Sequence, residues 1–127
     1  MDKKIKIAEK NKIIAKPRRG EIYWVKLDPV KGRSEIRKTR PCLIISNDIQ
    51  NEVSRRVMII PLTSSQKLPP APFHISLMFQ DKPAKILTEQ MRVTDKSRIK
   101  KGCLGKVSWE ILEQVENALH LTLDLKK

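Results

Sequence analysis

A chain of 127 residues, 39% of them hydrophobic, is long enough for one globular domain with a single modest core. No segment reaches the roughly 20 consecutive apolar residues of a membrane span, and the start of the chain lacks the continuous apolar stretch of a secretory signal. With 27 Lys and Arg against 14 Asp and Glu, the net charge of +13 favours polyanionic partners, above all nucleic acid.

The positive charge is concentrated at the start of the chain. Residues 1–19 contain eight basic and two acidic residues, a net charge of +6, which leaves +7 for the rest. Lysines interrupt the weak apolar spacing of this segment and Pro17 ends it, so we assign residues 1–18 to a basic N-terminal extension and 19–127 to the folded domain. The alternative is that the charge only keeps the protein soluble and meets no particular partner.

Five segments combine β-branched, aromatic and apolar residues in the way that strands do. They are residues 21–27, 41–46, 55–63, 73–77 and 84–93. A basic loop with Pro and Gly, 28–40, separates the first two, and residues 47–52 are expected to turn the chain before the third. The fifth strand is expected to bend near Gln90.

The last third of the chain predicts helices. Thr94 or Asp95 can cap a short helix, and Ser108 is a good N-cap for a longer one whose positive end suits Glu110. The apolar residues of the longer helix share one face, and they are Ile111, Leu112, Val115, Ala118 and Leu119. Short strands followed by one amphipathic helix predict a compact α+β domain, in which a small, mostly antiparallel sheet curves towards a barrel.

The side chains that most often bind metals or act as nucleophiles are scattered. Cys42 lies in an apolar run and is expected to be a buried thiol, and no Cys or His spacing suggests zinc, so we expect a reducing, cytoplasmic setting without a metal or cofactor. His120 is expected to be structural or to face solvent. His74 is expected to lie on a sheet surface, with a catalytic role as the alternative. No P-loop, GxGxxG, HExxH or GxSxG motif occurs.

Polar side chains gather instead at the predicted strand ends. Arg40 precedes the second strand, and the proline that follows it favours an extended backbone that projects the guanidinium. Ser46 and Asn47 end the second strand, Thr63 and Ser64 end the third, and Glu89 and Gln90 lie in the fifth. If the second, third and fifth strands are neighbours, these side chains could converge at one rim of the sheet.

Several short motifs occur in an order that is typical of one known family. They are Gly20-Glu21-Ile22, Ser34-Glu35, Thr39-Arg40-Pro41, Pro61-Leu62-Thr63-Ser64 and Glu89-Gln90-x-Arg92-x-x-Asp95-x-x-Arg98. From about Arg18 to the C-terminus, the sequence resembles the MazF/PemK family of toxins from bacterial type II toxin–antitoxin pairs. The resemblance implies an SH3-like barrel that forms a homodimer, and an acidic, MazE-like antitoxin whose disordered tail covers the RNA groove.

The resemblance also implies a metal-independent endoribonuclease that cuts single-stranded RNA, usually mRNA, at a short sequence and leaves a 2′,3′-cyclic phosphate and a 5′-hydroxyl. Arg40 and Thr63 match the catalytic pair of the family, and Glu89 matches an acidic position that some members use. Because an arginine keeps its proton at ordinary pH, it is a poor base. We therefore assign Arg40 first to charge stabilisation and second to proton donation to the leaving 5′-oxygen, and regard Glu89 as the more plausible base if it reaches the 2′-hydroxyl.

Further positions would bind the substrate. Ser64 and Gln90 would line the same site, and Glu35 would lie in the loop beside it. The basic side chains of that loop would follow the RNA backbone, and they are Lys31, Arg33, Arg37 and Lys38. Some family members have a histidine at the position of Ser34, so their acid–base assignment cannot be transferred whole.

Each of these residues has a structural alternative. Arg40 could be a surface ion-pair partner, Thr63 and Ser64 could be turn residues, and Glu89 could pair with Arg92 or a lysine. Arg92, Asp95 and Arg98 suggest a structural network in which Asp95 caps the short helix. Two other functions stay open at this point, a gyrase-poisoning toxin of the same fold and a non-catalytic nucleic-acid-binding barrel.

Overall fold

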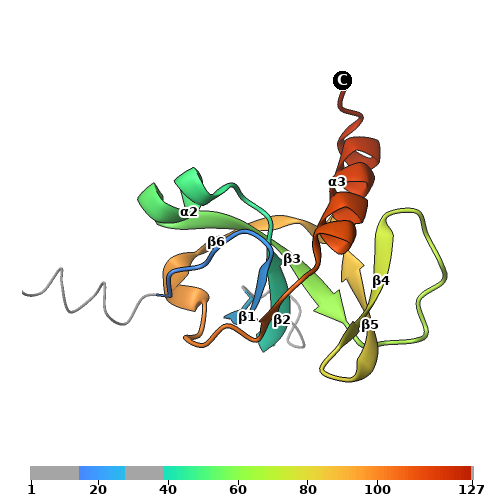
Figure 1. The fold of residues 1–127 in the computed structure, drawn as a ribbon, viewed down its shortest axis with the longest axis horizontal. Helices are drawn as coiled ribbons and strands as arrows, with labels where there is room; N and C mark the ends of the chain where they lie inside the picture. Colours follow the sequence, from blue (N-terminus) through green and yellow to red (C-terminus); the bar gives the residue numbers. More distant parts are fainter. Residues whose placement is uncertain (1–14, 28–38, 127) are drawn as a thin grey trace, which may run out of the picture.

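The computed structural model describes residues 15–27 and 39–126 of the chain. Its strands form one curled antiparallel sheet in the order β4-β5-β3-β2-β1-β7, with β6 paired to β3 off this path (Figure 1). The strands are β1 (Glu21–Lys26), β2 (Thr39–Ile44), β3 (Arg56–Thr63), β4 (His74–Phe79), β5 (Lys82–Leu87), β6 (Arg92–Asp95) and β7 (Gly105–Lys106). The helices are α2 (Asp48–Val53), α3 (Trp109–Leu123) and the 3₁₀ turns η2 (Thr88–Gln90) and η3 (Lys96–Arg98). The predicted α+β class, with a curved antiparallel sheet and a C-terminal helix, is confirmed.

The central strands are buried on both faces, which explains the uninterrupted apolar run of β2. Successive side chains of a strand point to opposite faces of its sheet. Cys42 and Ile44 therefore join one buried cluster, together with Tyr23, Val25 and Ile59, while Leu43 joins the other. Burial raises the pKa of the Cys42 thiol to about 12 although Arg92 and Arg40 oppose the shift, so the expected buried thiol is confirmed.

Helix α3 covers one of these clusters and lies beside β4 and β5 in Figure 1. The Ser108 hydroxyl accepts a hydrogen bond from the backbone N–H of Ile111, as an N-cap should. The predicted face packs against the sheet, with Val115 and Ala118 buried and Ile111, Leu112 and Leu119 partly buried. Within the described residues, no helix has the length and apolar character that crossing a bilayer requires.

Three segments differ from the prediction. Residues 48–53 form α2 instead of a turn, because the Asn47 side chain accepts a hydrogen bond from the Gln50 amide and caps a short helix that has no clear apolar period. The expected strand 84–93 is interrupted by η2, since β5 pairs with the end of β3 while β6 pairs with its beginning. The short strand β7 was not predicted, because it consists of only two residues, including a glycine.

Asp95 links the beginning of β3 to η3. Its carboxylate accepts a hydrogen bond from the backbone N–H of Ser97, which confirms the predicted cap, and it forms an ion pair with Arg55 at 3.2 Å. The backbone hydrogen bond is the main reason why the pKa of Asp95 falls to about 2.

The packed part of the chain begins before Arg19. Ala15 and Pro17 are buried, so these residues of the predicted extension contribute to the fold. The guanidinium of Arg19 then joins the β-sheet to α3, because it donates to the Ile45 carbonyl at 3.0 Å and pairs with Glu116 at 2.7 Å.

Candidate active site

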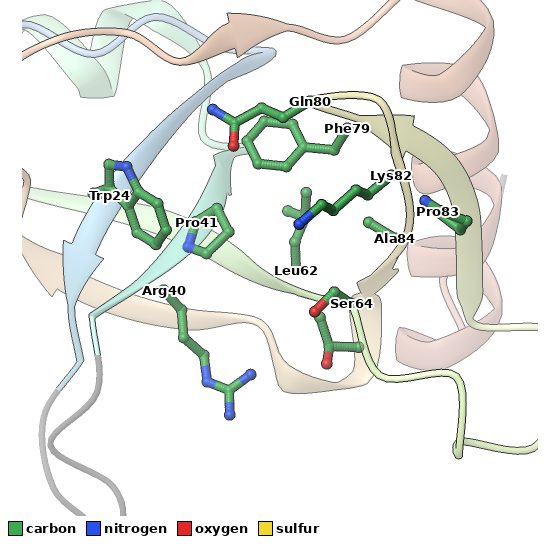
Figure 2. A pocket seen from close by; sticks show the side chains of 11 residues that line it. Trp24, Arg40, Pro41, Leu62, Ser64, Phe79, Gln80, Lys82, Pro83 and Ala84 are labelled. Atoms are coloured by element: carbon green, nitrogen blue, oxygen red, sulfur yellow. The ribbon is translucent and has the colours of Figure 1, made fainter.

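An open cavity of about 420 Å³ lies where β2 begins and β3 ends, and we call it the rim cavity. Its lining combines β1, β2 and β3 with the hairpin of β4 and β5. Three of the residues singled out from the sequence line it, and they are Arg40, Thr63 and Ser64. Figure 2 shows Arg40 and Ser64 at the same open side of the cavity.

The register of β2 and β3 brings Arg40 and Thr63 together. The ladder pairs Cys42 with Pro61 and Ile44 with Ile59. The same register continued by two residues places Arg40 opposite Thr63, and directly opposed residues of antiparallel strands share a face of the sheet. Two residues that are distant in the sequence are therefore neighbours because strands β2 and β3 pair.

The Arg40 side chain lines the rim cavity. It makes no ion pair or hydrogen bond with another residue in the described ranges. In Figure 2 the guanidinium extends away from β2. A guanidinium has planar, forked donors, for which a phosphate is the best geometric match.

Thr63 and Ser64 begin the turn that leaves β3. The Thr63 hydroxyl accepts a hydrogen bond from the Ser65 amide at 3.1 Å, and the Ser64 carbonyl accepts one from the Gln66 side chain at 3.1 Å. A hydroxyl that accepts one hydrogen bond can still donate its own proton. The role in the turn thus leaves the Thr63 hydroxyl able to bind a phosphate or a ribose hydroxyl.

Glu89 lies in η2 and not in a strand, and its partner is His74. Glu89 Oε2 and His74 Nε2 are 2.8 Å apart, so among the described residues Glu89 pairs with His74 and not with Arg92 or a lysine, the structural alternative. Neither Glu89 nor Gln90 is among the residues that line the rim cavity. Both belong to η2, which packs against β3 and α3.

His74 was expected to lie on a sheet surface, and the structure favours the alternative, a functional role. Its side chain is only 8% exposed, so it is not an ordinary residue of a sheet surface, and no residue in the described ranges bonds its Nδ1. The backbone brings it to Glu89, because the Thr88 amide and hydroxyl both donate to the Phe73 carbonyl. An imidazole joined to a carboxylate is suited to proton transfer near neutral pH.

Lys85 adds a cation beside Thr63 that was not singled out from the sequence. It is the direct partner of Thr63 on β5, and its ammonium donates to the Leu68 carbonyl at 3.2 Å. This hydrogen bond holds the segment that follows Ser64 against β5. Lys85 also adds positive charge on the side of the sheet where Arg40 lies.

The remaining predicted substrate-binding residues lie outside the described residues, and they are Lys31, Arg33, Glu35, Arg37 and Lys38. In the ranges that are described, no group of three or more His, Cys, Asp or Glu side chains could hold a metal ion.

Comparison with known proteins identifies the family. The family model for PemK-like, MazF-like toxins of type II toxin–antitoxin systems matches residues 18–123. The endoribonuclease MazF of Staphylococcus epidermidis is 37% identical over 112 residues, which cover 85% of this chain and 92% of that protein.

Solved structures agree in fold. MazF from Deinococcus radiodurans is 26% identical, with a TM-score of 0.72 over 86% of this chain and 97% of that one. An endoribonuclease from a mycobacterial species, solved in complex with its cognate antitoxin, is 22% identical, with a TM-score of 0.66 over 88% of this chain and 97% of that one. The chain therefore belongs to the family of PemK-like, MazF-like toxins of type II toxin–antitoxin systems.

Proposed function

We propose that this protein is the toxin of a toxin–antitoxin pair and a sequence-specific endoribonuclease that cleaves single-stranded RNA, chiefly mRNA, in the cytoplasm. Membership of the family supports the assignment as an endoribonuclease toxin. The observation that carries the site assignment is the meeting of Arg40 with Thr63 and Ser64 at the rim cavity. The net charge of +13 suits an RNA substrate.

The proposed reaction is attack by a ribose 2′-hydroxyl on the adjacent phosphate. The new O–P bond closes a 2′,3′-cyclic phosphate, the bond to the 5′-oxygen breaks, and that oxygen leaves as a hydroxyl after it gains a proton. Such an internal attack needs no water and no metal ion, only in-line geometry, proton transfer and stabilisation of the charge on the phosphate. Arg40 supplies the charge stabilisation and, as its second role, the proton for the leaving 5′-oxygen. Thr63 and Ser64 orient the phosphate or the attacking hydroxyl.

Proton removal from the 2′-hydroxyl is assigned to Glu89 together with His74. The contact of 2.8 Å between Glu89 and His74 supports treating the two side chains as one unit. In this unit the carboxylate orients the imidazole, and the proton taken from the 2′-hydroxyl is held between the two groups. Both side chains lie beside β3 and outside the lining of the rim cavity, whereas the 2′-hydroxyl lies next to the phosphate that it attacks. This assignment therefore requires the scissile ribose to sit between Thr63, at the end of β3, and the Glu89–His74 pair. Gln90, next to Glu89, would contact the same stretch of RNA.

The proposed partners follow from charge and family. The protein would act as a homodimer, and an acidic antitoxin with a disordered tail would compete with RNA for the basic groove. The mycobacterial relative that was solved with its cognate antitoxin supports such a partner. The basic loop residues Lys31, Arg33, Arg37 and Lys38, with Glu35, would follow the RNA backbone beside the site.

The test is cleavage of single-stranded RNA by the purified protein in the presence of EDTA, read on a denaturing gel. We expect cleavage with 2′,3′-cyclic phosphate ends, and its loss in Arg40→Ala and Thr63→Ala proteins that melt at the temperature of the wild type. Intact RNA that shifts on a native gel would favour a non-catalytic RNA-binding barrel. No interaction with RNA would favour a gyrase poison, and cleavage that EDTA abolishes would contradict the metal-independent mechanism.

A further inference from the structure

The rim cavity has an aromatic wall that the proposed cleavage mechanism does not use. Trp24 of β1 lines it and is 38% exposed, although it lies in a strand whose neighbouring residues, Tyr23 and Val25, are buried. Phe79, at the end of β4, lines it as well. The chain has only two Trp, one Tyr and two Phe, so two of its five aromatic residues border this one cavity.

The tip of the β4–β5 hairpin places an amide over this wall. Phe79 pairs with Lys82, so Gln80 and Asp81 form a two-residue turn, and both have positive φ, 51° and 63°. Turns of this kind prefer Asn-Gly, because side chains disfavour the left-handed region. Figure 2 shows the amide of Gln80 beside Phe79, on the side that faces Trp24. The left-handed backbone of this turn thus places a polar group at the cavity.

A cation reaches into the same cavity from the other side of the turn. Lys82 is exposed and, like Arg40, makes no ion pair or hydrogen bond with another residue of the described ranges. In Figure 2 its ammonium group extends from β5 across the cavity, above Leu62. The cavity therefore combines aromatic and apolar walls with one amide and one ammonium group, at a volume of about 420 Å³ that lies within the range of small-ligand sites.

We propose that the rim cavity binds one nucleobase of the RNA, next to the phosphate that Arg40 contacts, and selects uracil or guanine, which have a carbonyl oxygen (O4 or O6) where cytosine and adenine have an amino group. This inference rests on the proposed function and identifies part of its substrate sequence. Single-stranded nucleic acid is held by stacking on aromatic side chains, for which Trp24 is available. Lys82 offers only donors, so it favours uracil O4 or guanine O6 and disfavours the amino groups that cytosine and adenine have at the corresponding positions. Gln80 can both donate and accept at the edge of the base.

A fluorescence titration tests whether a base enters the cavity. Trp109, the other tryptophan, is 71% exposed on α3, so the Trp109→Phe variant contains Trp24 as its only tryptophan, which is excited selectively. The ligand is a short RNA with a 2′-deoxyribose at the attacking position, which removes the nucleophile. Each of the two bases that flank the uncleaved bond is deleted in turn as an abasic ribose. We expect quenching by the intact RNA, and its loss with one of the two abasic RNAs. No quenching, or equal quenching by all three, would overturn the inference.

Matched variants test the contacts. Trp24→Ala should weaken binding of the intact RNA on the order of tenfold or more and leave binding of the affected abasic RNA within about twofold. Lys82→Met should reduce the preference for uracil or guanine over adenine at that position, whereas Lys101→Met, an exposed lysine away from the cavity, should not. RNAs that differ only in this base distinguish uracil from guanine. Because Lys82 is exposed, its variant remains informative if Trp24→Ala does not fold.

Two results distinguish the base site from the proposed enzymatic function and from binding of an antitoxin peptide. If the protein binds and quenches with RNA but the wild type cleaves no RNA, the proposed enzymatic function fails while the base site stands. If both variants bind RNA normally but lose affinity for an acidic antitoxin peptide, the cavity is a site for that peptide and the inference is overturned.

Discussion

Replacement of Arg40 by alanine gives the most direct test of the catalytic assignment, because this side chain lines the rim cavity and the described part of the chain gives it no ion-pair or hydrogen-bond partner. It makes no ion pair or hydrogen bond with a residue in the described part of the chain, and it is only partly buried. Substitutions at such positions usually change the free energy of unfolding by no more than about 0.5 kcal/mol. For a chain of this size, the melting temperature should then move by no more than about 3 °C.

The expected loss of activity is much larger. A single preorganised donor to the charge of a transition state is worth on the order of 10²–10³ in rate, or about 3–4 kcal/mol. We expect Arg40→Ala to lower the single-turnover cleavage rate of a labelled RNA by this factor. Arg40→Lys keeps the charge but not the planar fork, so it should recover only part of the rate.

The matched control is Arg56→Ala, which removes an exposed arginine at the opposite end of β3 from Thr63. It should reduce RNA binding modestly through the loss of one charge and leave the rate of the bound complex unchanged. The assignment is refuted if Arg40→Ala cleaves within about threefold of the wild type, or if Arg56→Ala loses as much rate as Arg40→Ala.

Three further predictions concern other parts of the molecule. Glu89→Gln and His74→Asn should each lower the cleavage rate. Because the two side chains act as a pair, the double variant should lose little more rate than either single variant. Fully additive losses in this double-mutant cycle would contradict a paired role. The pKa of Asp95 is about 2 in the folded state, below its unfolded value of about 4, so its stabilising effect is complete above pH 4 and is lost as the pH falls from about 4 to about 2. Denaturant unfolding of Asp95→Asn across pH 2–7 should show a shallower decline than the wild type, and an identical decline would count against this. Val115 lies on the face of α3 that packs against the sheet and is fully buried, so Val115→Ala should lower the free energy of unfolding by about 2 kcal/mol in chemical denaturation. The exposed control Glu113→Ala should change it by less than about 0.5 kcal/mol, and equal effects would show that α3 is not docked as described.

Local signals explain the elements that could be predicted. Ser108, followed by apolar residues at helical spacing, predicted α3. The uninterrupted run of apolar residues around Cys42 predicted a strand that is buried on both faces. Helix α2 was missed because its signal is a single cap, Asn47, on a helix too short to show a period. The break at η2 was missed because β5 and β6 look alike in sequence and differ only in which part of β3 they join.

Candidate residues of the site could be named from the sequence, since Arg40 beside a proline and Thr63 at a strand end match motifs of the family. The proximity of Arg40 and Thr63 could not be derived from the sequence. It depends on the register of β2 with β3, and a shift by one residue would send one of the two side chains to the other face of the sheet.

Composition and neighbours along the chain were enough to predict the charge of the protein, its family, the α3 helix and the identity of the polar strand-end residues. The pairing of Glu89 with His74, and the position of Trp24 at the cavity of Arg40, became visible only in the folded chain. These arrangements arise from hydrogen-bonded strands and turns that join distant segments, and a local pattern carries no information about which distant residue a side chain will meet.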